Sequence, residues 1–275
     1  PTAHADAYEY YLKAKFKFDK YKSMLNKEDL VNTRELLQQS IKLDNNLLAA
    51  NILLGQTYLR EKRNSGEANK LDIITKDIFE NTLQKAEDLG DKLWEGRSLR
   101  NIGNIYWDID KEKAFDYYYR SLIISKEIGD MIGMYRAQHN IGNTYLFRGN
   151  LDKAIDNHLH SLEISEQIEY IRGYRESLRI LGYSYLFQGD YIRSLQYSRR
   201  AHNINNEYND KYKQGQTLDN MGYAYFQTGE YSNAADYLEN ALIIKKEIGM
   251  EGATLLATKT LLYLTYKKLD KKYDN

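Results

Sequence analysis

The sequence predicts an all-α fold, a right-handed superhelical solenoid in which antiparallel helix pairs stack side by side. Three observations carry this prediction. A short motif with a glycine and a tyrosine recurs at a fixed period, apolar residues follow the three-and-four spacing of an amphipathic helix, and glycines interrupt these stretches at regular intervals. Because one helix pair cannot bury its apolar face alone, repeated pairs are expected to stack and leave a concave inner wall.

The repeated motif sets the period. Its glycines are Gly103, Gly142, Gly182 and Gly222, which lie 39, 40 and 40 residues apart. Each glycine is followed three residues later by a tyrosine: Tyr106, Tyr145, Tyr185 and Tyr225. A glycine inside a helix costs roughly 0.5–1 kcal/mol relative to alanine, so its return at the same phase indicates a packing requirement.

The stretch from 136 to 168 contains one complete unit of the repeat. Gly142 lies among apolar residues on the face of a first helix, Gly149 breaks that helix, and Ala154 begins the apolar spacing of a second helix. Two antiparallel helices approach closely only where each offers a small side chain, so Gly142 and Ala154 are expected at the crossing. The tyrosine is expected to fill the wedge beside it.

The period divides the chain into about six units and a final helix, and we expect residues 1–275 to form a single array. The predicted segments are a divergent first unit at 5–43, a second unit at 46–89, regular units at 92–128, 131–168, 171–208 and 211–248, and a capping helix at 251–269. The second unit is longer because of a polar, glycine-containing loop at 63–69, which is either a contact loop or a tolerated surface insertion.

The two ends of the chain depart from the regular pattern. The first helix, expected at 5–21, has Tyr8, Tyr11, Leu12, Phe16 and Phe18 among its apolar positions. The last helix carries Leu262 where the repeat has glycine, and lysines follow it, which suits a cap whose outer face needs no further neighbour.

The pattern resembles the tetratricopeptide repeat (TPR) family, whose first helices carry Leu-Gly followed by Tyr and whose second helices carry small residues. It is closest to the variant of about forty residues per unit found in LGN/Pins spindle adaptors and kinesin light chains. A weaker resemblance links the N-terminal segment DAYEYYLKAKFKF to the TPR tails of bacterial class III nucleotide cyclases and related signalling proteins.

The resemblance implies a binding surface on the concave wall. In the family, first-helix residues beside the glycine and one or two turns before it point inward. We therefore expect a peptide-binding set at Arg97, Arg100, Asn101, Asn104, Arg136, His139, Asn140, Asn143, Arg179, Tyr183, Asn220 and Tyr223.

The residue types in this set suit an extended peptide with some acidic residues. Arginine binds carboxylates through two parallel hydrogen bonds, and an asparagine amide offers a peptide backbone one donor and one acceptor. The asparagines stand at positions that form a ladder in LGN-like relatives, although Ile180 and Tyr183 interrupt it. The alternative is that the arginines are solvated surface residues and that the asparagines bond a neighbouring helix.

Catalysis, metal binding and a cofactor are not expected. The chain has no cysteine, which excludes thiol nucleophiles and cysteine metal sites and is compatible with a reducing, cytoplasmic compartment. His158 and His160 are two residues apart, so they point to different sides of a helix, and His158 is expected in the core. No phosphate-binding loop or nucleophile elbow is present.

Composition further limits the partners. The formal net charge is zero, which provides no general attraction to nucleic acid or to an anionic membrane, and no apolar run is long enough to span one. We therefore expect a scaffold that binds a protein or peptide in its groove. The alternative is a regulatory or self-associating segment of a larger bacterial signalling protein, such as a nucleotide cyclase.

Overall fold

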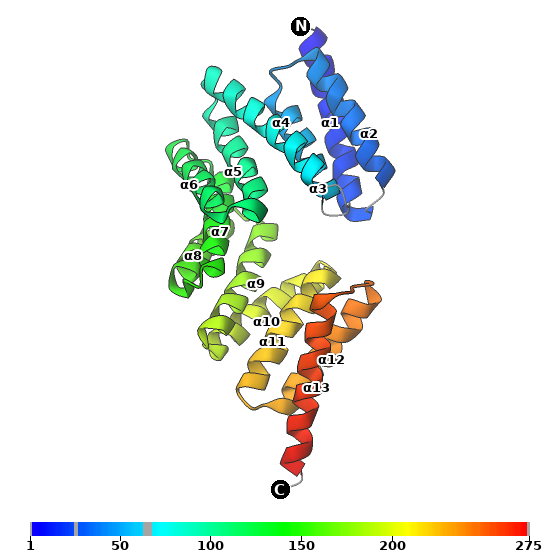
Figure 1. Ribbon diagram of the computed structural model, residues 1–275, viewed down its shortest axis with the longest axis vertical. Helices are drawn as coiled ribbons and strands as arrows, with labels where there is room; N and C mark the ends of the chain where they lie inside the picture. The colour runs from blue at the N-terminus through cyan, green and yellow to red at the C-terminus, as the bar shows by residue number, and fades with distance from the viewer. Residues whose placement is uncertain (1, 25–26, 63–67, 274–275) are drawn as a thin grey trace. The chain divides into compact units, whose positions relative to one another are not determined.

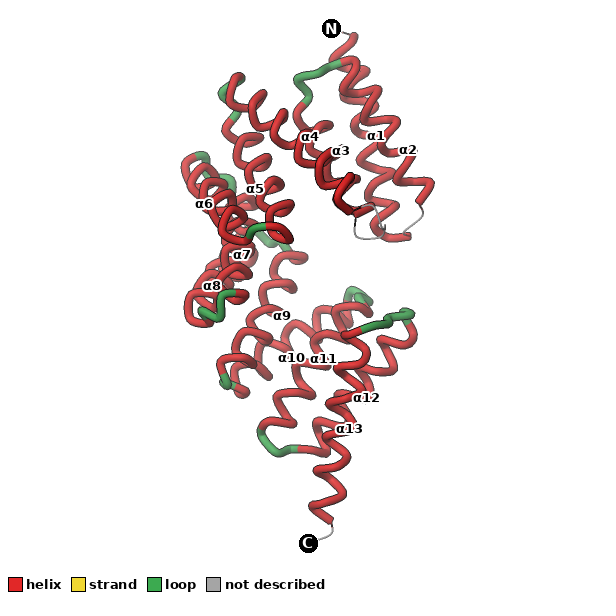
Figure 2. Tube along the Cα trace, in the orientation of Figure 1, coloured by secondary structure: helices red, strands yellow, loops and turns green. Residues whose placement is uncertain are grey.

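The computed structural model describes residues 2–24, 27–62 and 68–273, and every regular element in these residues is a helix (Figure 2). The first six helices are α1 (Thr2–Met24), α2 (Lys27–Leu43), α3 (Leu48–Lys62), α4 (Ala68–Asp88), α5 (Lys92–Ile109) and α6 (Lys111–Glu127). The others are α7 (Met131–Phe147), α8 (Leu151–Gln167), α9 (Ile171–Gln188), α10 (Tyr191–Glu207), α11 (Lys211–Gln227), α12 (Tyr231–Glu247) and α13 (Ala253–Tyr273).

The chain divides into two compact units, residues 1–137 and 138–275, and the division falls within α7. In the N-terminal unit α1 pairs with α2, α3 with α4 and α5 with α6; in the C-terminal unit α9 pairs with α10 and α11 with α12, and α13 packs on α12 (Figure 1). The predicted stack of helix pairs is thus confirmed within each unit. A single array over all 275 residues stays a prediction.

Short links end and restart the helices as the sequence predicts. The glycine or asparagine in the link adopts a left-handed backbone, as at Gly129 with φ +70° and Asn209 with φ +49°. The next residue caps the following helix: the Asp210 side chain, for example, accepts a hydrogen bond from the backbone N–H of Lys213 at 3.2 Å. Residues 63–67 of the predicted long loop lie outside the described residues, and α4 begins directly after them.

The repeated glycine marks where the second helix of a pair crosses the first. A Cβ atom added at Gly103 would lie 2.6 Å from the ring of Tyr118 and 3.3 Å from the carbonyl oxygen of Ala114. The small residue of the second helix therefore lies close to the glycine, as predicted, and a side chain four residues later covers it. That covering side chain differs between pairs: Phe79, Tyr118, His158, Ser198 and Leu238.

A methyl group at this crossing should destabilise the N-terminal unit. We expect Gly103→Ala to lower the free energy of unfolding by about 1–3 kcal/mol, because overpacking against the buried Tyr118 ring outweighs the helix-propensity gain of about 1 kcal/mol. Urea unfolding followed by circular dichroism measures the loss. In a Tyr118→Ala background the same substitution should be tolerated, and an equal cost in both backgrounds would contradict the packing explanation.

The repeated tyrosine also packs as predicted. Tyr106 stacks on Tyr117 with ring centroids 5.5 Å apart, and Tyr185 stacks on Tyr197 at 5.4 Å. Tyr225 and Tyr237 repeat the arrangement at 5.3 Å. In these three pairs the tyrosine of the first helix therefore packs against the second helix, which accounts for six of the 26 tyrosines of the sequence.

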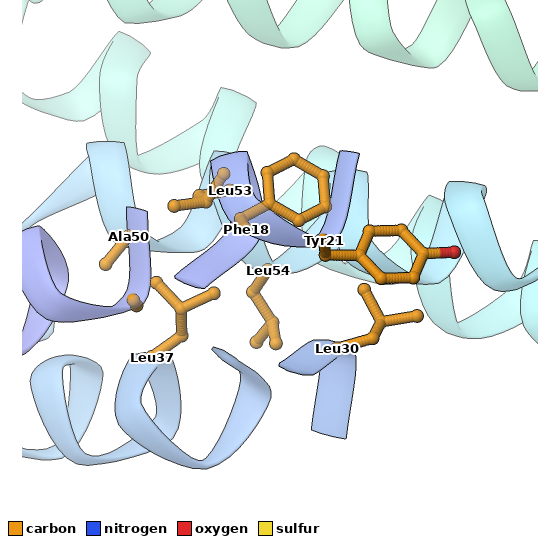
Figure 3. Close-up of a cluster of buried hydrophobic side chains, with 8 residues drawn as sticks. Phe18, Tyr21, Leu30, Leu37, Ala50, Leu53 and Leu54 are labelled. Carbon is orange, nitrogen blue, oxygen red and sulfur yellow. The ribbon is translucent and has the colours of Figure 1, made fainter. Parts of the chain in front are cut away.

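The N-terminal core joins three helices, as Figure 3 shows. Phe18 and Tyr21 of α1 pack with Leu30 and Leu37 of α2 and with Ala50, Leu53 and Leu54 of α3. Three of the apolar positions expected in the first helix lie elsewhere: Tyr8, Leu12 and Phe16 are 51%, 45% and 72% exposed. They form a second apolar stripe at four-residue spacing, whereas Ala7, Ala14, Phe18 and Tyr21 lie on the buried side.

Candidate functional site

The C-terminal unit contains an open cavity of about 920 Å³ between the first helices α9 and α11 and the final helix α13. Its lining is mostly apolar and aromatic. The main apolar contributors are Tyr183, Leu186, Phe187, Tyr212, Tyr223, Leu256, Ala257, Leu261 and Leu264. A concave apolar surface with few polar groups is the usual form of a binding site.

Aromatic rings form the wall that α9 and α11 contribute. Tyr183 and Phe187 lie one helical turn apart, with ring centroids 4.5 Å from each other. Tyr212 and Tyr223 of α11 are 53% and 39% exposed, although both are large aromatic residues. These rings offer rigid contact area to a ligand at little cost in side-chain entropy.

The opposite wall comes from α13, which is apolar on two sides. Leu262 is 8% exposed and packs with Ala235 and Leu238 of α12. Leu256 and Leu264, which point to the other side of the helix, are 63% and 43% exposed and line the cavity. The predicted capping helix therefore also forms part of a cavity.

One buried polar group points to a ligand in this cavity. Asn220 lines it and is 8% exposed, and its amide nitrogen Nδ2 has no hydrogen-bond partner among the described residues. A buried donor without a partner costs about 1–3 kcal/mol. A ligand carbonyl oxygen would remove this cost once the amide, which is itself covered in the free chain, turned toward the cavity.

The charged groups beside the cavity are already paired within the chain. Arg179 donates to Glu176 at 2.5 Å, and Lys213 donates to the other oxygen of Glu176 at 2.6 Å. Burial alone would raise the pKa of Glu176, but these two cations lower it well below its ordinary value. The carboxylate-binding role expected of Arg179 is therefore filled by Glu176.

A second ion pair joins α11, α12 and α13. Lys245, which is 2% exposed, forms an ion pair with Asp219 and donates to the hydroxyl of Thr258 at 2.7 Å. The Thr258 hydroxyl lies 2.8 Å from the other oxygen of Asp219. The charge of Lys245 is thus matched by that of Asp219.

The N-terminal unit places three predicted arginines together. Arg97 lies over the Trp94 ring at 4.6 Å, Arg100 is 5% exposed, and Arg136 is exposed. Arg100 is therefore a buried residue rather than the open surface residue that the inward-facing pattern implied. Burial and the nearby Arg136 and Arg97 charges lower its pKa to about 9.

Several predicted asparagines have partners in their own unit. Asn101 is 3% exposed and donates to the carbonyl of Arg97 at 2.8 Å, and Asn104 accepts from the Tyr118 hydroxyl at 3.1 Å. The Asn104 contact matches the alternative in which the asparagine bonds a neighbouring helix, whereas Asn101 bonds its own helix α5. Asn140 and Asn143 are half-buried on α7.

His139, which is half-buried, and His158, which is buried, form a ring pair in the C-terminal unit. Their ring centroids are 5.3 Å apart, and the prediction that His158 lies in the core is confirmed, since it is 0% exposed. Burial lowers the pKa of His139 to about 4 and that of His158 well below its ordinary value. Both imidazoles are therefore neutral at pH 7.

Of the twelve predicted residues, Arg179, Tyr183, Asn220 and Tyr223 line the cavity, and Arg97, Arg100 and Arg136 form the separate arginine group. Sequence analysis missed Phe187, Tyr212, Leu256 and Leu264. The signal for Phe187 was its four-residue spacing from Tyr183, and the signal for α13 was a second apolar stripe at 257, 261 and 264.

No group of three or more histidine, cysteine, aspartate or glutamate side chains in residues 2–24, 27–62 and 68–273 could hold a metal ion. None of the helices described for this chain is both long enough and apolar enough to cross a membrane.

Comparison with known proteins agrees with the repeat architecture. Residues 135–168, which cover most of α7 and α8, and residues 174–247, which cover α9 to α12, each match a family model described as a tetratricopeptide repeat. No curated protein matches the sequence.

Solved structures share the fold. A signal transduction ATPase with numerous domains and a tetratricopeptide repeat sensor, from Pyrococcus horikoshii, is 18% identical with a TM-score of 0.68, and the match covers 86% of this chain and 35% of that protein. The apo form of RapI is 15% identical, with a TM-score of 0.63 and coverage of 98% and 99%. Kinesin light chain TPR-like repeats from Podosopora anserina are 14% identical, with a TM-score of 0.58 and coverage of 74% and 97%.

Proposed function

Because residues 135–168 and 174–247 match the tetratricopeptide repeat family and the helix pairs repeat its fold, we propose that this chain acts as a non-catalytic scaffold in the cytoplasm, holding an extended segment of a protein partner along its first helices. Repeats of this family generally mediate protein–protein interaction. The C-terminal unit binds the segment in the cavity between α9, α11 and α13.

The unpartnered amide of Asn220 is the observation that carries this proposal. It lies in the cavity with Tyr183 and Tyr223, so a bound peptide would present a backbone carbonyl to Nδ2 while its side chains pack on the rings. A backbone contact of this kind tolerates many sequences, and the apolar pockets around it supply the selectivity.

The ion pairs beside the cavity indicate the polarity of the partner segment that binds there. Glu176 pairs with both Arg179 and Lys213, and Asp219 pairs with Lys245, so an acidic side chain of a partner would have to compete with a carboxylate that each cation already binds. The segment bound in the C-terminal unit is therefore apolar or aromatic. The acidic residues expected of the partner belong with the arginines of the N-terminal unit.

Peptides selected by phage display against the full chain test this function. We expect Tyr183→Ala/Tyr223→Ala to weaken the selected apolar peptides by tenfold or more, since aromatic anchors at binding sites contribute about 2 kcal/mol or more each. We also expect Asn220→Ala to weaken them by about tenfold, a typical loss for one buried hydrogen bond. Fluorescence anisotropy with labelled peptides measures both.

Tyr263→Ala is the matched control, because Tyr263 is 57% exposed on α13 but does not line the cavity. Its affinity for the same peptides should equal that of the wild type. If the double variant keeps full affinity while retaining the wild-type circular dichroism spectrum, the cavity is not the binding site.

A second candidate function is a regulatory segment within a larger signalling protein. The Pyrococcus protein favours it, since its sensor is a tetratricopeptide repeat and this chain matches 35% of that protein's length. The complete open reading frame tests this candidate. A frame that encodes no domain beyond the repeats would exclude it, and a catalytic domain in the same frame would support it.

A further inference from the structure

Arg97, Arg100 and Arg136 form a group of three cations in the N-terminal unit. The equivalent position in a later repeat has a carboxylate beside its arginine, whereas this group contains no carboxylate. Arg97 and Arg100 lie one turn apart on α5, and Arg136 lies at the start of α7. Arg136 occupies the position of Arg97 in the following repeat, six residues before the glycine. The charges of Arg97 and Arg136 are close enough to Arg100 to oppose its protonation.

Arg100 is the central residue of this group. It is 5% exposed, and its guanidinium forms neither a hydrogen bond nor an ion pair with any residue that the structure describes. The nearby acid is Asp130, which lies beyond ion-pair distance of Arg100 and accepts a hydrogen bond from the Gly133 N–H at 3.0 Å. A buried charge without a hydrogen-bonded partner is among the most costly arrangements in a folded protein.

A later repeat contains an arginine at the position equivalent to Arg100, and its surroundings can be compared with those of Arg100. Arg179 is the equivalent of Arg100 two repeats later, three residues before the glycine, and there the residue six before the glycine is Glu176. Glu176 binds Arg179 at 2.5 Å and so balances it. In the N-terminal unit the same position holds Arg97, a cation, so this position supplies no balancing anion, and among the carboxylates of the described residues only Asp130 lies near enough to favour the charge of Arg100.

We propose that Arg97, Arg100 and Arg136 form a binding site for a phosphate monoester on a side chain of a protein partner. Three guanidinium groups against the one carboxylate of Asp130 leave a surplus of two positive charges. A phosphorylated side chain carries about −1.5 to −2 charges at pH 7 and three acceptor oxygens, whereas a carboxylate carries one charge and two oxygens. The planar guanidinium of Arg100 binds two phosphate oxygens in parallel from the buried side.

This site lies in the other unit from the cavity, so its test is separate from the test of the peptide groove. Calorimetry with N-acetyl-phosphoserine amide, N-acetyl-aspartate amide, inorganic phosphate and sulfate compares the candidate anions. We expect the phosphoserine derivative to bind at least about tenfold more tightly than the aspartate derivative. Its affinity should rise between pH 5 and pH 7 as the phosphate loses its second proton, while that of sulfate stays constant.

Substitutions identify the residues. We expect Arg136→Gln to weaken the phosphoserine derivative by about tenfold and Arg100→Lys by about tenfold or more, because lysine cannot form the paired contact. Arg120→Gln, an equal loss of charge at an exposed site on α6, should leave binding unchanged. Arg100→Leu should abolish binding without lowering the melting temperature, since it removes an unbalanced buried charge.

Three results would overturn the proposal. The first is an absence of binding by the wild-type chain, and the second is an equal loss in Arg120→Gln and Arg136→Gln. The third is binding of inorganic phosphate with exclusion of the phosphoserine derivative, which would make this a site for a free anion rather than for a modified partner.

Discussion

Lowering the pH from 7 to 5 is expected to destabilise the C-terminal unit by up to about 4 kcal/mol, at most about 2 kcal/mol for each of the buried His158 and the half-buried His139. Both imidazoles have their pKa lowered by burial, that of His139 to about 4. The unfolded chain takes up protons below pH 6.5, whereas the folded chain does not until its lower pKa is reached. Stability is therefore complete above pH 6.5 and is lost as the pH falls through this window.

The measurement is hydrogen exchange of the helices α8 and α9 at pH 7 and pH 5, together with urea unfolding at the same two values. The window from 6.5 to 5 lies above the ordinary pKa of aspartate and glutamate, so it isolates the histidines, which in this unit include the half-buried His202, whose pKa is also lowered by burial. His160→Gln serves as the control, because His160 is exposed on the same helix as His158. A pH dependence unchanged by removing His158 would contradict this explanation.

His158→Leu should both stabilise the unit and reduce its pH dependence by about half. Neither ring nitrogen of His158 has a hydrogen-bond partner among the described residues, an arrangement that costs about 1–3 kcal/mol. Leucine already covers the glycine in the last pair, where Leu238 faces Gly222. We therefore expect a gain of about 1–3 kcal/mol at pH 7. A loss of stability would mean that the imidazole fits the site better than an apolar side chain.

Removing Lys245 is expected to loosen the attachment of α13 to the unit. In Lys245→Met the carboxylate of Asp219 keeps only the hydroxyl of Thr258, and the pair that joins three helices is broken. Breaking a buried ion pair by removing one partner costs about 3–5 kcal/mol, and because the Asp219 side chain is 28% exposed we expect about 2–4 kcal/mol. Faster amide exchange in α13 than in α11 would locate the effect.

Two further variants separate the charge from the packing. Lys246→Met removes the neighbouring exposed lysine and should change stability by less than about 0.5 kcal/mol. Lys245→Met/Asp219→Leu removes both charges and should recover most of the loss, because an apolar pair can replace a buried ion pair. An equal cost for Lys245→Met and Lys246→Met would show that the ion pair does not hold α13.

Features fixed by neighbouring residues could be predicted from the sequence. The helix at Tyr191–Glu207 begins and ends as expected, because a capping aspartate precedes it and a left-handed Asn209 follows it. The repeated glycine predicted a close approach of two helices. Glycine destabilises a helix relative to alanine, so its return at the same position indicates that no larger side chain fits there. These signals lie within a few residues of the feature that they determine.

Features that depend on distant residues could not be predicted in the same way. The pairing of Lys213 with Glu176 joins residues 37 positions apart, and the burial of Arg100 depends on how its neighbours pack around it. The repeat frame correctly assigned Tyr183 and Tyr223 to one surface, but it could not distinguish an arginine that is balanced from one that is not. The exposed apolar side of α13 was also not predicted, because the sequence was interpreted only as a capping helix.

The side chains that cover the repeated glycines also help to prevent mispairing. A chain of similar helix pairs could form its hairpins between the wrong segments during folding. Phe79 and Ser198 occupy equivalent places but differ greatly in volume, so exchanging their helices would overfill one crossing and leave a void in the other. Variation at this single position therefore gives each first helix a preferred partner among otherwise similar sequences.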